Sequence, residues 1–269
     1  MKIDSYMPVR IISGADCLLK NSNALIKMGK RCFIVTGRSS ARLSGALDDV
    51  FSIFHENGIE YTVFDRIEPN PLTKTCFEAG VTAREFGCDY VLGIGGGSVL
   101  DAAKAVAIFC SNPLMNHCDI YNRAVPSAHV PVALIGTTSG TGSEVTGVSV
   151  LTNSDTGLKK SISGPDCYAD ITFSDSKYTK SVSEDTRISA CLDALAHAVE
   201  AYCASTCNDL VELYAKKAIS LIAPFIICSR FRDLSDEEID SLHSASVFAG
   251  LAINIAGTCF PHTVGYYLT

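Results

Sequence analysis

Up to Asp175, short apolar runs alternate with longer stretches of helical periodicity, and this alternation constrains the fold more than any other feature. The apolar runs predict strands at Cys32–Thr36, Tyr61–Phe64, Tyr90–Ile94 and Val130–Ile135, and the stretches between them predict helices at Leu43–Asn57, Thr73–Phe86 and Ser98–Cys110. Strands and helices in turn predict βαβ units, right-handed crossovers and a parallel sheet. Short strands are also expected at Val150–Thr152 and Ile171–Phe173, with an edge strand at Tyr6–Ile12.

Beyond Asp175 the pattern predicts helices alone. We expect helices from Ser183 to Cys203, over Leu210–Ile227 and from Ser235 to Ile255. Pro224 marks a kink or a boundary in the second of these helices. Ser235 has a glutamate three residues later, which is the pattern of a capping box. The sequence therefore predicts an α/β domain over residues 1–178 and an all-α domain over residues 179–269.

Charge and composition restrict the partners of the chain. Its 269 residues carry a formal net charge of −7, which argues against nucleic acid or an anionic membrane as the main partner because both attract a basic face. No apolar run reaches about 18 residues, so no membrane span is expected. The N-terminal segment lacks the apolar stretch of a secretory signal. With 12 cysteines and no such signal, we expect reduced thiols in a cytoplasmic protein.

A glycine-rich turn follows the expected strand Tyr90–Ile94. Gly95, Gly96, Gly97 and Ser98 open a helix, and glycines let a ligand approach the backbone while a helix N-terminus presents free N–H groups. A phosphate or pyrophosphate is expected there, with a ligand-free strand-to-helix turn as the alternative. Asp101 in the first turn either stabilises the helix dipole, the plainer interpretation, or contacts a ligand hydroxyl.

A second polar loop, GTTSGTGSEVT, follows the strand Val130–Ile135. Open parallel sheets bind ligands at the carboxyl ends of their strands, and the hydroxyls of Thr137, Thr138 and Thr141 can bind phosphate or ribose. Lys159 and Lys160 follow as candidate phosphate-binding cations, although solvated surface lysines are at least as common.

Asp193 and His197 stand four residues apart on a strongly helical segment. This spacing is about one helical turn, so both side chains project from one face. One carboxylate and one imidazole can bind a divalent metal there. An isolated pair of this kind is more often a hydrogen-bonded pair that orients the ring.

Taken together, these blocks resemble the iron-containing (group III) alcohol dehydrogenases. The resemblance is carried by GGGSVLDAAKAVA, GTTSGTGSEVT, CLDALAHAVEAY, the EPNP segment with Asn70, and the late block AGLAINIAGTCFPHTVGYYLT. It runs from Tyr6 to Thr269. It implies a dehydroquinate synthase-like architecture, in which a dinucleotide-binding α/β domain precedes a helical domain that holds metal and substrate.

The resemblance implies that Asp193, His197 and His262 are metal ligands. The family takes a fourth histidine from a segment beyond Thr269, so the helical domain is expected to be truncated. Fe(II) is the expected metal, and the same ligands also suit Zn(II). Tyr266 stands where many members carry a second histidine near the nicotinamide, and it is expected to be catalytic although its hydroxyl is a poor base at neutral pH.

The cofactor type is argued from the turn after the first core strand. By resemblance, NAD-preferring members of the family carry an acidic residue in this turn, whereas this chain has Thr36-Gly37-Arg38-Ser39-Ser40. Similarity to members with TGKSS-like turns favours NADP(H) over NAD(H). The candidate cofactor-binding residues are Gly37, Ser39, Ser40, Asn70, Gly95, Gly96, Gly97, Ser98, Asp101, Thr137, Thr138, Thr141 and Lys159.

The expected function is an NAD(P)-dependent alcohol dehydrogenase or aldehyde reductase that acts on a small alcohol or aldehyde. A homodimer paired through edge strands is expected by resemblance. Two alternatives stay open. One is a catalytically incomplete nucleotide-binding fragment. The other is an enzyme of the glycerol dehydrogenase or dehydroquinate synthase type, and the synthase chemistry requires a cluster of Lys and Arg that residues 175–269 lack near the proposed ligands.

Overall fold

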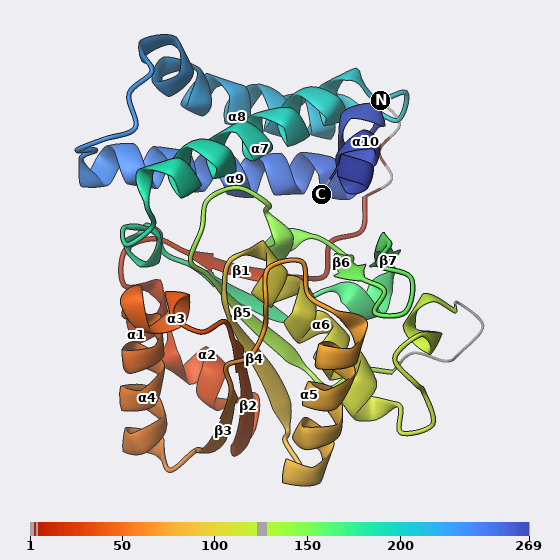
Figure 1. Ribbon diagram of the computed structural model, residues 1–269. Helices are drawn as coiled ribbons and strands as arrows, with labels where there is room; N and C mark the ends of the chain where they lie inside the picture. Colours follow the sequence, from red (N-terminus) through yellow and green to blue (C-terminus); the bar gives the residue numbers. More distant parts are fainter. Residues whose placement is uncertain (1–2, 4, 123–127, 269) are drawn as a thin grey trace.

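The computed structural model describes residues 3, 5–122 and 128–268, without the side chains of Thr263 and residues 266–268. An α/β layer lies below a layer of long helices (Figure 1). The α/β layer contains a six-stranded parallel sheet in the order β1-β8-β5-β4-β2-β3. Its strands are β1 (Arg10–Ser13), β2 (Arg31–Thr36), β3 (Glu60–Phe64), β4 (Tyr90–Gly95), β5 (Val132–Gly136) and β8 (Ile171–Ser174).

The predicted strands and their parallel pairing are confirmed, with corrections at two starts. β5 begins at Val132 rather than Val130, since Pro131 has no N–H for the ladder. β1 is an edge strand, as predicted, but it begins at Arg10 rather than Tyr6. The carbonyl of Tyr6 instead accepts hydrogen bonds from the Tyr168 hydroxyl and the Asn254 amide.

The strand predicted at Val150–Thr152 lies outside the parallel sheet. It forms β6 (Val148–Thr152), which pairs antiparallel with β7 (Lys159–Ser163) in a separate hairpin. β7 was not predicted, because its sequence KKSIS has too few apolar residues to be distinguished from a loop.

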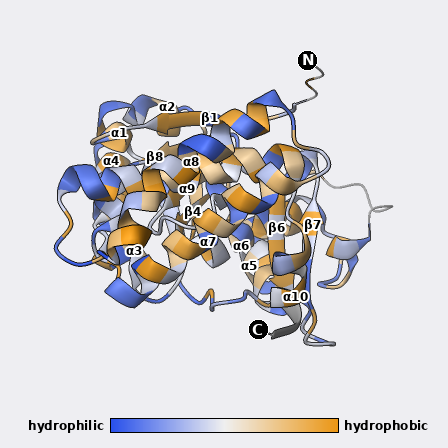
Figure 2. Ribbon diagram, turned by 90° about the horizontal axis from the view of Figure 1, so that it is seen from above, coloured by the Kyte–Doolittle hydropathy of each residue, from blue (hydrophilic) through white to orange (hydrophobic). Residues whose placement is uncertain are grey.

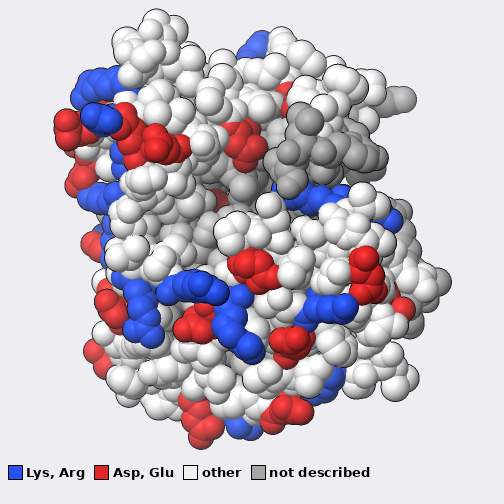
Figure 3. All heavy atoms as spheres, in the orientation of Figure 1, with Lys and Arg blue, Asp and Glu red and all other residues white. Residues whose placement is uncertain are grey.

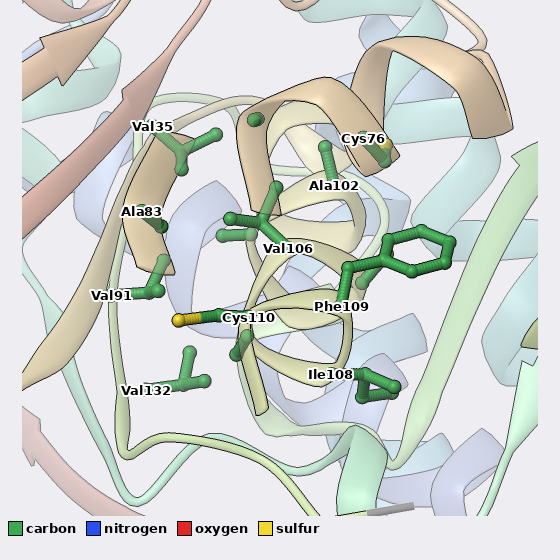
Figure 4. Close-up of a cluster of buried hydrophobic side chains, with 14 of the residues drawn as sticks. Val35, Cys76, Ala83, Val91, Ala102, Val106, Ile108, Phe109, Cys110 and Val132 are labelled. Carbon is green, nitrogen blue, oxygen red and sulfur yellow. The ribbon is translucent and has the colours of Figure 1, made fainter. Parts of the chain in front are cut away.

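Helices cover both faces of the sheet (Figure 1). One face carries α1 (Cys17–Lys20), α2 (Ser22–Ile26), α3 (Ser40–Leu43) and α4 (Ala46–Asn57), and the other carries α5 (Thr73–Phe86) and α6 (Gly97–Ser111). Alternate strand residues enter opposite cores: Val35 and Val91 face α5 and α6, as Figure 4 shows, whereas Ile34 and Leu92 face the other group. The helix predicted at Leu43–Asn57 is interrupted, because Gly45 adopts φ 79° and caps α4.

The upper layer contains α7 (Glu184–Cys203), α8 (Asp209–Cys228) and α9 (Asp236–Ala256), which share a core of their own. Ser183 caps α7, and Ser235 forms the predicted capping box with Glu238. Pro224 is not a boundary, because α8 continues to Cys228 while Ile222 and Phe225 hold it in the helical core. The short helix α10 (Phe260–Leu268) lies near β7 (Figure 2).

Among the described helices, α9 is the one that is long and apolar enough to cross a membrane by length and composition. It packs against α7 and α8 and buries Ala245, Ala249 and Ala252 between them. Viewed from above, hydrophilic segments alternate with hydrophobic ones along the helices of this layer (Figure 2). This pattern is typical of helices in a packed bundle.

His243 joins the two layers. From α9 its Nε2 lies 2.8 Å from the Ser174 hydroxyl at the end of β8, and its Nδ1 lies 3.3 Å from the Ser139 hydroxyl in the loop after β5. The side chain is buried. Burial lowers its pKa to about 4, although Asp240 and Asp175 oppose the shift.

We predict a pH-dependent loss of stability from His243. Its pKa falls from an ordinary 6.5 to about 4 on folding, so the unfolded chain takes up the proton first as pH drops through this window. The free energy of unfolding should therefore fall by about 3 kcal/mol as the pH drops from 6.5 to about 4, with no further loss from His243 at lower pH. Urea unfolding should show that His243→Gln removes this part of the pH dependence. The exposed-site control His55→Gln should retain it, and identical pH profiles for His243→Gln and wild type would contradict the assignment.

Candidate metal and dinucleotide site

A cavity of about 270 Å³ lies between the two layers. Figure 3 shows this face of the molecule hollowed at that level. The lining residues come from both layers: Asn70, Pro71, Gly97, Ser98, Asp101, Thr141, Ser143, Thr146, Val148, Val150, Lys159, Asp193, His197, Ile253, Gly257, Thr258 and His262. The cavity therefore lies at the carboxyl ends of the parallel strands, where open α/β sheets bind their ligands.

The glycine turn brings the N-terminus of α6 to this cavity. A Cβ on Gly97 would lie 2.5 Å from the Thr141 methyl group, and one on Gly95 would lie 2.6 Å from Val99. Glycine is needed at both positions because the polar loop and the first turn of α6 approach so closely. In the described chain no side chain caps this turn, so its N–H groups suit a pyrophosphate.

The polar loop after β5 lies against the same turn. Thr141 lines the cavity, whereas Thr138 packs on Gly96. The buried hydroxyl of Thr137 has no hydrogen-bond partner among the described residues. A buried, unsatisfied hydroxyl costs free energy, but Thr137 is not among the residues that line the cavity, so its predicted contact with the cofactor stays a prediction.

Asp101 connects α6 to the loop and the hairpin. Its carboxylate accepts hydrogen bonds from the Ser143 hydroxyl at 2.5 Å and from the Val150 N–H at 2.9 Å. Burial raises its pKa, while nearby Lys104 opposes the shift. The prediction that Asp101 lies in the first turn of the helix is wrong, because α6 begins at Gly97 and has no acidic residue in its first turn. The carboxylate oxygens of Asp101 instead hold the loop and the hairpin.

Three potential metal ligands meet on the helical side of the cavity. The donor atoms of Asp193, His197 and His262 lie within 4.8 Å of one another. Asp193 Oδ1 is 3.3 Å from His262 Nε2 and 3.9 Å from His197 Nε2, and the two imidazoles stack with centroids 4.4 Å apart. One carboxylate oxygen and two imidazole nitrogens converging on one point form a donor set for a divalent transition metal.

Electrostatics in this cluster favour a cation. Burial would raise the pKa of Asp193, but the hydrogen bond with His262 and the nearby positive charges outweigh it and lower the pKa. Burial lowers the pKa of His197, which keeps its imidazole neutral and able to ligate. The hydrogen bond to Asp193 raises the pKa of His262. A bound metal would therefore replace a proton at His262.

Glu200 supports His262 from α7. Its Oε1 lies 2.5 Å from His262 Nδ1, and its Oε2 accepts the Cys259 N–H at 2.7 Å. Metal-binding histidines usually have such a carboxylate partner at the second ring nitrogen. We did not predict Glu200 from sequence, although its position three residues after His197 on one helix is a usable signal.

The remaining predicted residues divide into two groups. Asn70 lines the cavity, and its N–H donates to the Ser98 hydroxyl at 3.3 Å; Lys159 lines the cavity from β7. Gly37, Ser39 and Ser40 do not line it. They follow β2 beside α6, since a Cβ on Gly37 would lie 3.6 Å from a Val99 methyl group. The side chain of Tyr266 lies outside the described residues, so its predicted role stays a prediction.

Comparison with known proteins identifies the family. Residues 8–176 match the iron-containing alcohol dehydrogenases, and residues 187–269 match the C-terminal part of the Fe-containing alcohol dehydrogenase family. These matches cover most of the sequence. The chain belongs to the iron-containing alcohol dehydrogenase family.

A curated relative and two solved structures give the degree of likeness. The NADPH-dependent butanol dehydrogenase of Clostridium saccharobutylicum is 32% identical over 86% of this chain, which spans 60% of that protein. An iron-containing alcohol dehydrogenase of Thermotoga maritima superposes with a TM-score of 0.92 at 35% identity, covering 99% of this chain and 73% of the other. The sulfoacetaldehyde reductase of Bifidobacterium kashiwanohense in complex with NAD+ gives 0.90 at 28% identity, covering 100% and 71%.

We predict that Glu200→Gln weakens metal binding. The variant loses the negative charge that holds His262 Nδ1, so metal affinity should fall roughly 10–100-fold. Competition with a chelator, followed by metal analysis, measures this change. The matched control is Glu237→Gln at an exposed position of α9, which should leave the affinity unchanged. Equal metal retention by both variants would remove Glu200 from the site.

Proposed function

We propose that this protein is a metal-dependent oxidoreductase that transfers a hydride between NAD(P) and a short-chain alcohol or aldehyde. One observation carries the proposal: the donor atoms of Asp193, His197 and His262 converge in a cavity that also contains the uncapped N-terminus of α6. Metal and dinucleotide would thus share one space.

The lining of the cavity supports an assignment of its two ends. Gly97, Ser98 and Thr141 would hold the pyrophosphate at the N-terminus of α6. Asn70 lies beside Ser98 and would hold the adjoining phosphate or ribose. The nicotinamide would then extend toward the three metal ligands.

The other walls suit a small substrate. Val148, Val150 and Ile253 contribute apolar surface to the cavity, and a cavity of about 270 Å³ has little room for a long chain beside a nicotinamide. When bound, the cation supplies Lewis-acid polarisation of the substrate oxygen, and the dinucleotide carries the hydride. The residues of the protein would position both groups.

The family implies iron, and Fe(II) is our proposed metal. The donor set alone does not enforce it, because carboxylate and imidazole also suit Zn(II), which binds such sites more tightly. A sugar-phosphate cyclase is less well supported, since its chemistry needs a cluster of Lys and Arg, and Lys159 is the one Lys or Arg among the described residues of the cavity lining.

The edge strand β1 and the cysteines support two further proposals. In the described chain β1 is an edge strand of the sheet, which suits pairing with a second copy in a homodimer. The described cysteines form no disulfide with one another, which suits the reducing cytoplasm.

We predict that His197→Ala abolishes metal retention and turnover while dinucleotide affinity changes only a few fold, because Gly97, Ser98 and Thr141, rather than this imidazole, would hold the pyrophosphate. Metal analysis, aldehyde-dependent NADPH oxidation and nicotinamide fluorescence titration measure the three quantities. The control His55→Ala removes an exposed imidazole on α4. Undiminished metal content and activity in purified His197→Ala would rule out the proposed site.

We propose NADP(H) as the preferred dinucleotide. The turn after β2 presents Arg38, Ser39 and Ser40 and no carboxylate that would repel a 2′-phosphate. Basic side chains gather on this face over α3 and its neighbouring loops (Figure 3). The butanol dehydrogenase relative is NADPH-dependent, whereas the sulfoacetaldehyde reductase structure contains NAD+, so related proteins use both.

We predict that Ser39→Asp shifts the preference toward NAD(H). A carboxylate near the 2′-phosphate should change the ratio of kcat/KM for NADPH to kcat/KM for NADH by on the order of tenfold or more, through like-charge repulsion. Ser52→Asp on the exposed face of α4 adds the same charge elsewhere and should leave the ratio unchanged. A wild-type enzyme that prefers NADH would contradict the proposal directly.

A further inference from the structure

A second group of potential metal ligands lies outside the cavity. It forms where the segment after α6 meets the turn between β6 and β7. The donor atoms of His117, Cys118 and Asp155 lie within 4.8 Å of one another. None of the three lines the cavity described above.

The donor atoms of this group lie close enough together to bind one zinc ion after small movements. Cys118 Sγ lies 3.2 Å from Asp155 Oδ2, while His117 approaches these two groups with different ring nitrogens: Nδ1 lies 3.4 Å from Cys118 Sγ, and Nε2 lies 3.6 Å from Asp155 Oδ2. A single nitrogen of the ring would bind the ion, and one ligand atom from each residue lies within 4.8 Å of the other two. Zinc bonds of about 2.3 Å to sulfur and about 2.0 Å to nitrogen or oxygen, at tetrahedral angles, place neighbouring donors roughly 3.3–3.6 Å apart. Small side-chain movements would thus be enough to admit an ion.

Neighbouring residues hold the donors in place. Asp155 Oδ1 pairs with Lys74 Nζ at 2.9 Å, which leaves Oδ2 facing the thiol and the imidazole. The Thr73 hydroxyl lies 3.3 Å from His117 Nδ1, and Asn153 Oδ1 accepts the Asp155 N–H at 2.9 Å. These contacts correspond to the outer-shell partners that orient ligands at metal sites.

The charge and exposure of the cluster also suit a dication. A thiolate and a carboxylate beside one lysine leave one net negative charge, and about half of the Asp155 side chain is exposed, so an ion can reach the site.

We infer that His117, Cys118 and Asp155 form a second metal site, of the class that takes Zn(II), with water as the fourth ligand. Thiolate and imidazole ligands favour zinc over magnesium or calcium. The ion would hold the turn between β6 and β7 against the segment after α6 and the start of α5. That turn leads directly into Lys159, which lines the cavity, so the site would also steady one wall of the cavity.

Cobalt(II) substitution tests this inference, because the Asp193, His197 and His262 set contains no sulfur. Co(II) added to the metal-free protein should produce a sulfur-to-cobalt charge-transfer absorption that saturates at one equivalent. Cys118→Ser should lose this absorption and one equivalent of bound metal. Cys203→Ser, an exposed-thiol control on α7, should retain both.

Two further variants distinguish a test of the second metal site from a test of the proposed dehydrogenase function. His197→Ala should retain the sulfur absorption, since it affects the other site alone. Asp155→Asn removes the carboxylate charge and keeps the cysteine, so it should weaken Co(II) binding measured by the same absorption. This variant tests the site even where Cys118→Ser does not fold. A wild-type protein without the sulfur absorption, or a folded Cys118→Ser variant that keeps it, would overturn the second site while leaving the dehydrogenase proposal intact.

Discussion

The buried ammonium of Lys104 is the interaction on which the cavity depends. From α6 it donates to the carbonyls of Ser143, Thr146 and Val148 at 2.7–3.0 Å, and its side chain is fully buried beside Asp101. An unpaired buried charge costs several kcal/mol, so the chain keeps this ammonium surrounded by oxygen atoms. The loop after β5 and the start of β6 therefore cannot move away from α6 without exposing or abandoning that charge.

Because the loop after β5 is fixed in this way, the helical layer packs closely against it. A Cβ on Gly142 would lie 2.5 Å from the Cα of Gly250, so the backbone of α9 rests directly on the loop. Asn254, also on α9, accepts the N–H of Gly147 at 3.1 Å. Together with the contacts of His243, these interactions set the distance between α6 and the proposed metal ligands of α7. Residues that stand almost a hundred positions apart thus come to share one cavity.

Local sequence patterns were sufficient for the strands of the parallel sheet, for α5 to α9 and for the common helix face of Asp193 and His197, because period-two and helical periodicity, capping residues and a one-turn spacing are local properties. They did not predict the short helices α1 to α3. Patterns failed where distant contacts decide the outcome. The polar strand β7 exists because β6 pairs with it. Pro224 lies inside a helix because the surrounding core is stronger than its breaking effect. The convergence of His262 with Asp193 and His197 was reached through family resemblance, since no spacing rule connects residues so far apart.

The same reasoning explains why the two donor sets differ in kind. The set of Asp193, His197 and His262 lies between the layers and contains no sulfur. The buried Glu200 holds Nδ1 of His262, so helices fix the geometry of this set. The Cys118 set is assembled from a turn and a connecting segment, where the exposed Asp155 depends on Lys74 and Asn153 for its orientation. A thiolate, which binds zinc strongly, suits such a loosely supported site, whereas a site that must release and rebind substrate oxygen is better built from oxygen and nitrogen donors on rigid elements.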